Sequence, residues 1–151
     1  QNASFLSTAL IAVALLIPVD VCQAAEKSAV RKMKGTYLSG GRTIGITRFD
    51  PAGNGPHPTV VLLHGLDGAD TNQAGYEGVA SRLSKQGYIV FFVRYFDVFA
   101  SRSDDLTFFQ TNAKQHLLGP DCAERRRMWR AFQDCLTTVG DAVGFIAKNQ
   151  A

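Results

Sequence analysis

Residues 59–68 read TVVLLHGLDG, a run of five strand-forming residues that ends abruptly in His64-Gly65. An apolar run this short is typical of a strand buried on both faces of a parallel sheet, because a helix of the same composition would be longer and would repeat every 3.6 residues. Burial accounts for residues 60–63, but it does not account for an imidazole followed at once by a glycine. The stretch therefore predicts a strand over residues 59–63 and a loop with a separate task after it.

A β-hairpin is predicted upstream of this strand. Residues 34–38 and 42–49 have strand-like composition and flank Ser39-Gly40-Gly41, which suits a glycine-bearing turn between two antiparallel strands. Residues 50–58, DPAGNGPHP, contain three prolines and two glycines. We expect this segment to be a loop.

A helix and a second strand are predicted downstream. Thr71 and Asn72 are both candidate N-caps, and Gly87 stands where a helix C′ residue is expected. Residues 88–95, YIVFFVRY, suit a second buried strand. The apolar face of the helix follows a 3-4 spacing and comprises Tyr76, Val79, Ala80 and Leu83. Strand, helix and strand in this order predict a βαβ unit with parallel strands.

The remaining residues predict two more helices. Ser103-Asp104-Asp105 begins a short one that ends at Gly119-Pro120, inside a long connection over residues 97–121 that suits a lid or a pocket wall. Its apolar face comprises Leu106, Phe109, Ala113 and Leu117. Residues 124–148 predict one long helix with a core-facing stripe. This stripe comprises Trp129, Phe132, Leu136, Val139, Val143 and Ile146.

Composition is that of one modest globular domain, with 151 residues, 46% apolar and 19% charged. A net charge of +3 is too small to predict nucleic-acid binding. The densest basic patch, Arg125–Arg127 with Arg130, suits a solvated helix face, with an anionic partner as the alternative. The spacing of the cysteines and of His57, His64 and His116 matches no metal-binding pattern, so we expect no metal and no cofactor.

The first 25 residues differ from the rest. Residues 9–17, ALIAVALLI, followed by the small-residue segment 22–25, are typical of a secretory signal peptide. The run is shorter than the roughly 20 residues that a spanning helix needs. The chain opens on Gln1 without a methionine or a basic region. We therefore expect residues 1–25 to be an N-terminally incomplete signal peptide that directs the protein to the periplasm or outside the cell. A native start at Met33 and a retained membrane anchor are the alternatives, and lipidation of Cys22 is not expected.

The cysteines raise a question of redox state. In an oxidising compartment Cys122 and Cys135 could form a disulfide, provided that Cys122 folds back along the helix that carries Cys135. Two free, partly buried thiols are an equally good interpretation.

With these elements in place, residues 58–97 (PTVVLLHGLDG through LSKQGYIVFFVRYFD) resemble the N-terminal half of an α/β-hydrolase and are most similar to dienelactone hydrolase-like enzymes. The resemblance implies an HG-x-x-G turn over residues 64–68, in which the backbone N–H of Leu66 contributes to the oxyanion hole. His64 is then expected to hold the loop and not to transfer protons. The expected substrate-binding residues are His64, Gly65, Asp67, Gly68, Tyr95 and Phe96. The alternative is a glycine-rich turn of another doubly wound protein, although no nucleotide-loop motif occurs.

No nucleophile elbow of the G-x-S-x-G type is present. Ser39 lies in the hairpin turn and Cys135 in the middle of a helix. In the family the elbow follows the long helix, so residues 26–151 are expected to form an incomplete α/β-hydrolase domain without its catalytic triad. The strand at 59–63 would then present an unpaired edge, and this part alone is expected to be neither stable nor active.

The resemblance implies a secreted carboxylic-ester or lactone hydrolase that acts on a small molecule. It implies no nucleic-acid partner and no stable membrane anchor once the signal peptide is removed. The alternative function is a non-catalytic α/β-hydrolase-like protein that binds a ligand or a partner. A partial gene product without a function of its own is compatible with either.

Overall fold

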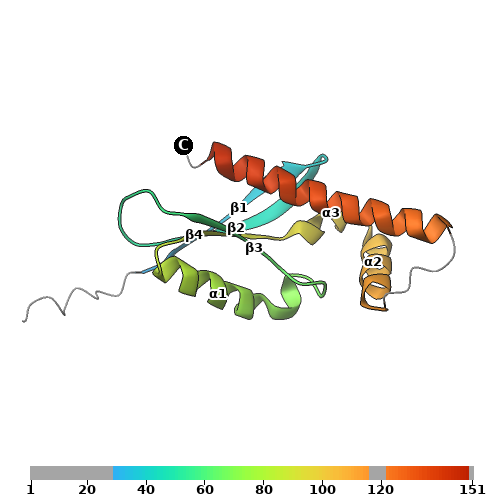
Figure 1. The fold of residues 1–151 in the computed structure, drawn as a ribbon, viewed down its shortest axis with the longest axis horizontal. Helices are drawn as coiled ribbons and strands as arrows, with labels where there is room; N and C mark the ends of the chain where they lie inside the picture. Colours follow the sequence, from blue (N-terminus) through green and yellow to red (C-terminus); the bar gives the residue numbers. More distant parts are fainter. Residues whose placement is uncertain (1–28, 116–121, 150–151) are drawn as a thin grey trace, which may run out of the picture.

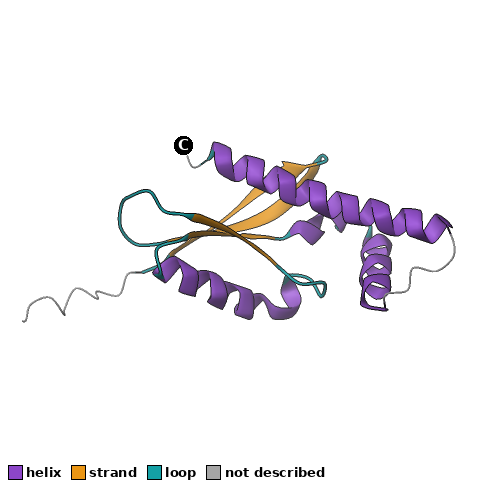
Figure 2. Cartoon of the chain, in the orientation of Figure 1, coloured by secondary structure: helices purple, strands orange, loops and turns teal. Residues whose placement is uncertain are grey.

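The structure is a computed structural model that describes residues 29–115 and 122–149. The predicted signal segment and the predicted helix end at Gly119-Pro120 lie outside these ranges. In the described part, four strands form one mixed sheet in the order β1-β2-β4-β3, accompanied by three α-helices (Figures 1 and 2). None of these helices is long and apolar enough to cross a membrane. The elements are β1 Arg31–Ser39, β2 Arg42–Asp50, β3 Thr59–Leu63, α1 Gln73–Lys85, β4 Ile89–Val93, α2 Ser103–Gln115 and α3 Cys122–Lys148.

The predicted hairpin is confirmed as β1 and β2, which pair in antiparallel register with Ser39 opposite Arg42. Gly40 and Gly41 form the two-residue turn with φ values of 54° and 75°. Positive φ at both central residues is the type I′ geometry that matches the twist of a hairpin and that glycine adopts at little cost.

The predicted βαβ unit is also confirmed. Strands β3 and β4 are parallel, with Val61 opposite Phe91. Helix α1 connects them and ends as the sequence predicts, because Gly87 has φ 94° and its N–H donates to the carbonyl of Ser84 at 2.9 Å. At the other helix end, Asn72 occupies the predicted N-cap position, but its side chain makes no cap hydrogen bond.

The sheet lies between helices on its two faces, with α1 on one face and α3 on the other (Figure 1). Alternation along β4 builds both interfaces: Val90 and Phe92 pack in the cluster under α1, and Phe91 and Val93 in the cluster under α3. Side-chain hydrogen bonds join α3 to β1. Tyr37 donates to the carbonyl of Thr138 at 2.8 Å and Ser39 to the carboxylate of Asp141 at 2.7 Å.

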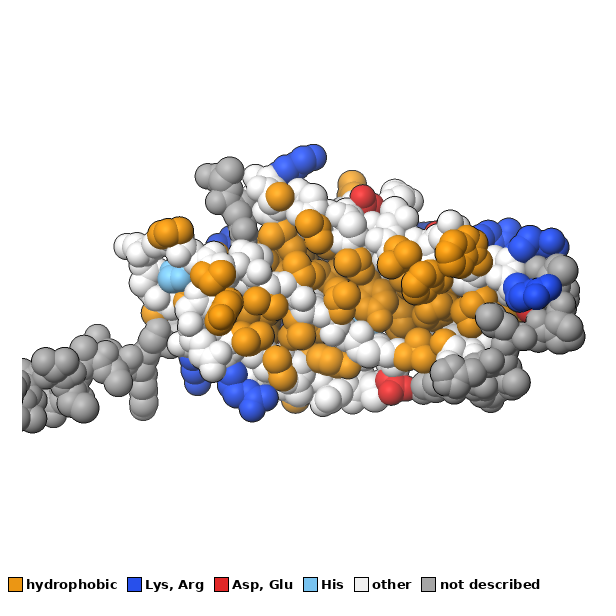
Figure 3. Space-filling model, in the orientation of Figure 1, with side chains coloured by type: hydrophobic (Ala, Val, Ile, Leu, Met, Phe, Trp, Pro, Cys, Tyr) orange, Lys and Arg blue, Asp and Glu red, His pale blue; other side chains and the backbone are white. Residues whose placement is uncertain are grey.

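The predicted core-facing stripe of α3 is wrong for most of its members. Trp129 is 58% exposed and Leu136 is 55% exposed. The buried residues of this helix are instead Ala131, Cys135, Thr138, Ala142 and Ile146. Four of these five are small, which lets the helix backbone approach the sheet closely. The larger side chains consequently lie one face further round the helix, where hydrophobic side chains gather on the surface (Figure 3).

Strand β3 is less buried than predicted. It pairs only with β4, and it is the last strand of the described sheet. Residues 60–62 are half-buried, while Thr59 and Leu63 are exposed. Burial on both faces was expected. A strand at the edge of the described sheet has a neighbouring strand on one side only, so fewer side chains cover it on each face.

Of the two interpretations of Cys122 and Cys135, the disulfide is not formed. Cys122 is the first residue of α3 and Cys135 lies thirteen positions further along the same helix. Thirteen helical residues span about 20 Å, whereas the Cα atoms of a disulfide lie within roughly 7 Å. Cys135 has a free, buried thiol, and the side chain of Cys122 lies outside the described residues.

Candidate functional site

The candidate site is the loop over residues 64–68, at the carboxyl end of β3. The neighbouring parallel strand β4 ends at the same edge of the sheet and leads into a short 3-10 turn, Tyr95–Phe99. The carboxyl ends of parallel strands are where open α/β sheets bind ligands. The predicted site residues from both segments therefore lie in the region that this architecture favours.

The loop is built on a β-turn. The N–H of Gly68 donates to the carbonyl of Gly65 at 3.0 Å, so Leu66 and Asp67 are the central residues of the turn. Gly68 follows with φ 90°, a conformation that explains glycine at this position. Thr71 adds a hydrogen bond from its hydroxyl to the carbonyl of Asp67 at 2.8 Å.

The peptide between Gly65 and Leu66 has a defined orientation. Its carbonyl oxygen accepts both the Gly68 N–H and the Nδ1–H of His64, the latter at 2.9 Å. Because the peptide is trans, the Leu66 N–H points the opposite way. No acceptor among the described residues takes this N–H. The turn thus presents an oriented backbone donor.

Two helices hold the loop from either side. The phenol oxygen of Tyr76, on α1, accepts the N–H of Gly65 at 2.7 Å. The side-chain amide of Gln110, on α2, donates to the carbonyl of Leu66 at 2.8 Å. Neither contact was predicted. Tyr76 was expected only on the apolar face of its helix, and nothing local marks Gln110 as more than a surface residue.

His64 is a buried member of the loop, only 4% exposed. Its ring stacks on Tyr95 with centroids 4.1 Å apart, and the phenol of Tyr95 donates to the His64 carbonyl at 3.0 Å. A carbonyl can only accept, so Nδ1 carries the proton that it donates to Gly65, and in a neutral ring Nε2 is then unprotonated. Burial lowers the pKa of His64, and the hydrogen bond to Gly65 offsets this only in part. The imidazole is therefore neutral at physiological pH and shapes the loop.

The predicted substrate-binding residues, except Gly65, which lines neither, are divided between two hollows. One, of about 430 Å³, is lined by His64, Asp67, Gly68 and Phe96, together with charged residues such as Arg94. The other, of about 280 Å³, is apolar. Its lining comprises Leu63, Leu66, Tyr95, Phe109, Phe132, Cys135, Leu136 and Val139.

Arg94 pairs with two carboxylates of the first hollow, those of Asp70 and Asp97. Arg94 donates to both oxygens of Asp70 at 2.8 and 2.9 Å, and its Nε lies 3.5 Å from Asp97. Asp97 in turn accepts the N–H of Gly45 at 2.9 Å. The hydrogen bond from Arg94 lowers the pKa of Asp70. Lowered pKa values keep carboxylates ionised, so Asp70 is suited to holding the loop in place and not to proton transfer.

The apolar hollow contains one potential nucleophile, Cys135. Burial, and to a lesser extent the nearby Asp134, raises the pKa of its thiol to about 12. A thiol with such a pKa is protonated at neutral pH and unreactive. Ser39, the other residue considered for this role, donates to Asp141 at the far end of β1. Within residues 29–115 and 122–149, no cluster of side chains is suited to hold a metal ion.

Comparisons of the sequence with protein-family models, with curated proteins and with solved structures found no match.

Proposed function

We propose that this chain is part of a carboxylic-ester or lactone hydrolase of the α/β-hydrolase type, similar to dienelactone hydrolases, and that Leu66 supplies an oxyanion-hole donor. The observation that carries the proposal is the unengaged Leu66 N–H, presented at the carboxyl end of β3 beside an apolar hollow. The nucleophile, acid and base are not among the described residues.

The chemistry of ester cleavage explains what such a donor does. Attack on the carbonyl carbon converts the carbonyl oxygen into an oxyanion, and a backbone N–H held in advance stabilises that charge as it forms. A Cys or Ser nucleophile would attack, a His would transfer the proton, and water would release the acyl group. The loss of one oxyanion donor costs on the order of 3 kcal/mol of transition-state stabilisation.

The topology supports the same proposal. An antiparallel hairpin precedes a parallel pair in the order β1-β2-β4-β3, and β3 is at the edge of the sheet that the described residues form. In the resembled family the strand that carries the nucleophile elbow pairs with the strand corresponding to β3. The proposal also includes secretion directed by residues 1–25. That segment lies outside the described residues.

The coding sequence beyond Ala151 gives the first test. The proposal expects an apolar strand that leads into G-x-[SC]-x-G, followed later by Asp and His. A stop codon at that point, or a turn without Ser or Cys, would contradict it and favour a non-catalytic binding protein.

The second test removes the Leu66 N–H from the extended enzyme, which is the longer protein that the coding sequence of the first test would specify. Leu66→Pro deletes the N–H, and proline is favoured at this position of a turn, so the loop conformation is retained. For the hydrolysis of p-nitrophenyl acetate, the kcat of Leu66→Pro should be lower than that of the parent by a factor of roughly 10²–10³. Leu66→Ala keeps the N–H and is the matched control, expected within about threefold of the parent. Equal kcat values for the two variants would contradict the role of Leu66.

A further inference from the structure

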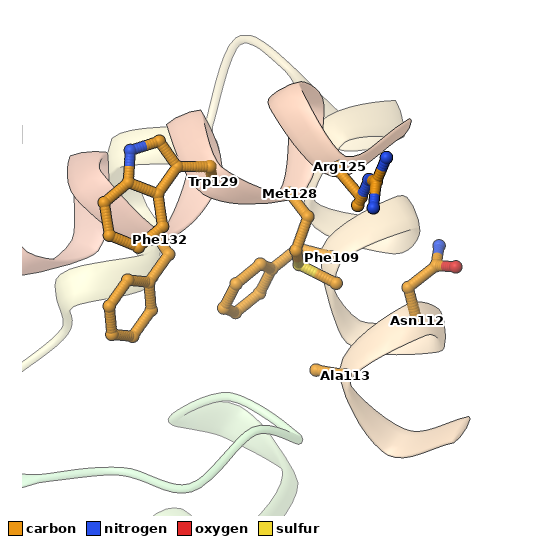
Figure 4. Close-up of a pocket in the computed structure, with 7 residues that line it drawn as sticks. All are labelled: Phe109, Asn112, Ala113, Arg125, Met128, Trp129 and Phe132. Carbon is orange, nitrogen blue, oxygen red and sulfur yellow. The ribbon is translucent and has the colours of Figure 1, made fainter. Parts of the chain in front are cut away.

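The apolar hollow beside Leu66 continues into a larger groove between α2 and α3. The groove has a volume of about 610 Å³, and it shares Phe109 and Phe132 with the hollow. Together they form one apolar trough that runs from the oxyanion loop along the two helices. The groove lining comprises Phe109, Asn112, Ala113, Arg125, Met128, Trp129 and Phe132 (Figure 4).

The groove has one aromatic end, one polar end and an apolar middle. Trp129 and Phe132 lie at one end of the close-up, and Asn112 and Arg125 lie at the other (Figure 4). The middle is formed by Phe109 and Met128, whose side chains offer no strong hydrogen-bonding atom. Trp129 and Phe132 are 58% and 43% exposed. Large apolar side chains left open to solvent around a concave surface favour binding of an apolar group.

We propose that this trough binds the hydrocarbon arm of the substrate, an alkyl or aryl chain attached to the ester carbonyl. The inference rests on the proposed function, because the carbonyl is placed by the Leu66 N–H at one end of the trough. An ester carbonyl carries one group on its carbon and one on its oxygen, and a chain on either side would leave the loop along Phe132 and Phe109. The groove volume falls in the range of roughly 300–1,000 Å³ that suits small-molecule ligands.

This assignment makes the preferred substrate an ester with an extended apolar arm. A compact, polar lactone would leave the groove empty and its aromatic lining in water. A longer chain would bury more of that lining, and each added methylene would contribute about 0.8 kcal/mol of transfer free energy, or roughly a fourfold gain in affinity.

The single tryptophan of the chain, Trp129, allows binding to be measured directly. The purified full chain is titrated with ethyl butanoate, hexanoate and octanoate while Trp129 emission is recorded. The expected result is a shift to shorter wavelength with a dissociation constant that falls by roughly fourfold per methylene. The described residues provide no reactive nucleophile to consume the esters.

A variant that fills the groove gives an independent readout. Ala113→Phe places a ring inside the groove and should weaken octanoate binding at least tenfold. Ala74→Phe makes the same change at an exposed position of α1, outside the trough, and should leave binding unchanged. The chain-length series on the parent protein does not depend on whether either variant folds.

Three results would overturn the proposal. They are an emission that no ester changes, an affinity independent of chain length, and an emission that shifts with protein concentration alone because a second copy covers this face. Failure of the proposed function looks different: chain-length-dependent binding would persist, while Leu66→Pro and Leu66→Ala of the extended enzyme would show the same kcat.

Discussion

The Nδ1–H of His64 donates to the carbonyl oxygen of Gly65, the next residue in the chain, at 2.9 Å. This short-range bond sets the tautomer of the imidazole and the direction of the peptide that follows. It explains why a histidine ends an otherwise apolar strand. The side chain is a positioning group for the Leu66 N–H, and its buried surroundings suit a neutral ring.

In the described sheet β3 pairs only with β4, and its other edge should make the chain self-associate by strand pairing. Leu63→Lys places a charge at this edge, and we expect a larger monomer fraction in size-exclusion chromatography with light scattering. Leu38→Lys is the control, because Leu38 is also exposed but lies on β1 at the other side of the sheet. An equal gain in monomer from the control would contradict a specific role of the β3 edge.

Stability should fall as the solution becomes acidic. Burial lowers the pKa of His64 in the folded chain, so between this value and the unfolded value near 6.5 the unfolded chain binds more protons. The free energy of unfolding should therefore decrease as pH drops below about 6.5. His64→Asn keeps an N–H donor for Gly65 but cannot titrate. In a Leu63→Lys background, which limits association, urea unfolding of this variant should show a smaller decrease in the free energy of unfolding. An identical pH profile for both proteins would exclude His64 as the cause.

The phenol of Tyr76 should stabilise the loop. Tyr76→Phe removes the acceptor of the Gly65 N–H but keeps the ring that stacks on Phe92 at 5.3 Å. We expect a loss of about 1 kcal/mol in the free energy of unfolding, measured with urea in the same Leu63→Lys background. Tyr88→Phe, whose hydroxyl makes no hydrogen bond to a described residue, should cost less than about 0.5 kcal/mol. Equal losses would show that the phenol bond contributes nothing.

The thiol of Cys135 should be inert in the folded chain. Its pKa rises from 9.0 to about 12, which lowers the thiolate fraction by a factor on the order of 10³, and burial hinders access further. With Cys22 and Cys122 replaced by Ser, reaction with Ellman's reagent at pH 8 should be at least ~100-fold slower than for free cysteine. Denaturant should restore the ordinary rate. Fast labelling without denaturant would contradict the buried, protonated thiol.

Local signals predicted most of the fold. The glycine pair of the hairpin, the two short apolar strands and the 3-4 spacing of the helices depend on nearby residues only, so they could be read from the sequence. Gly87 ended α1 for the same reason. The two disagreements in burial, at α3 and β3, depend on distant packing: periodicity identifies an apolar arc on a helix, but the small residues Ala131 and Ala142 decide which half of the arc meets the sheet.

The site was predictable in part. The HG-x-x-G pattern predicted a turn over residues 64–68, and the structure has one there, whereas the oxyanion role of the Leu66 N–H stays a prediction. Tyr76 and Gln110 could not be identified, because they act on backbone atoms of a loop that lies far from Gln110 in the sequence. Phe109 and Phe132 were recognised as apolar, but their place beside Leu66 depends on how α2 and α3 meet.

The bond between Gln110 and the carbonyl of Leu66 also makes the loop sensitive to the position of α2. Phe109 and Ala113, close to Gln110 on the same helix, line the groove. An occupant that displaces α2 would therefore change the tilt of the Leu66–Asp67 peptide. By thermodynamic linkage, if occupancy of the groove stabilises one loop geometry, that loop geometry stabilises binding in the groove by the same free energy. In the proposed trough, this one side-chain amide would couple the two ends.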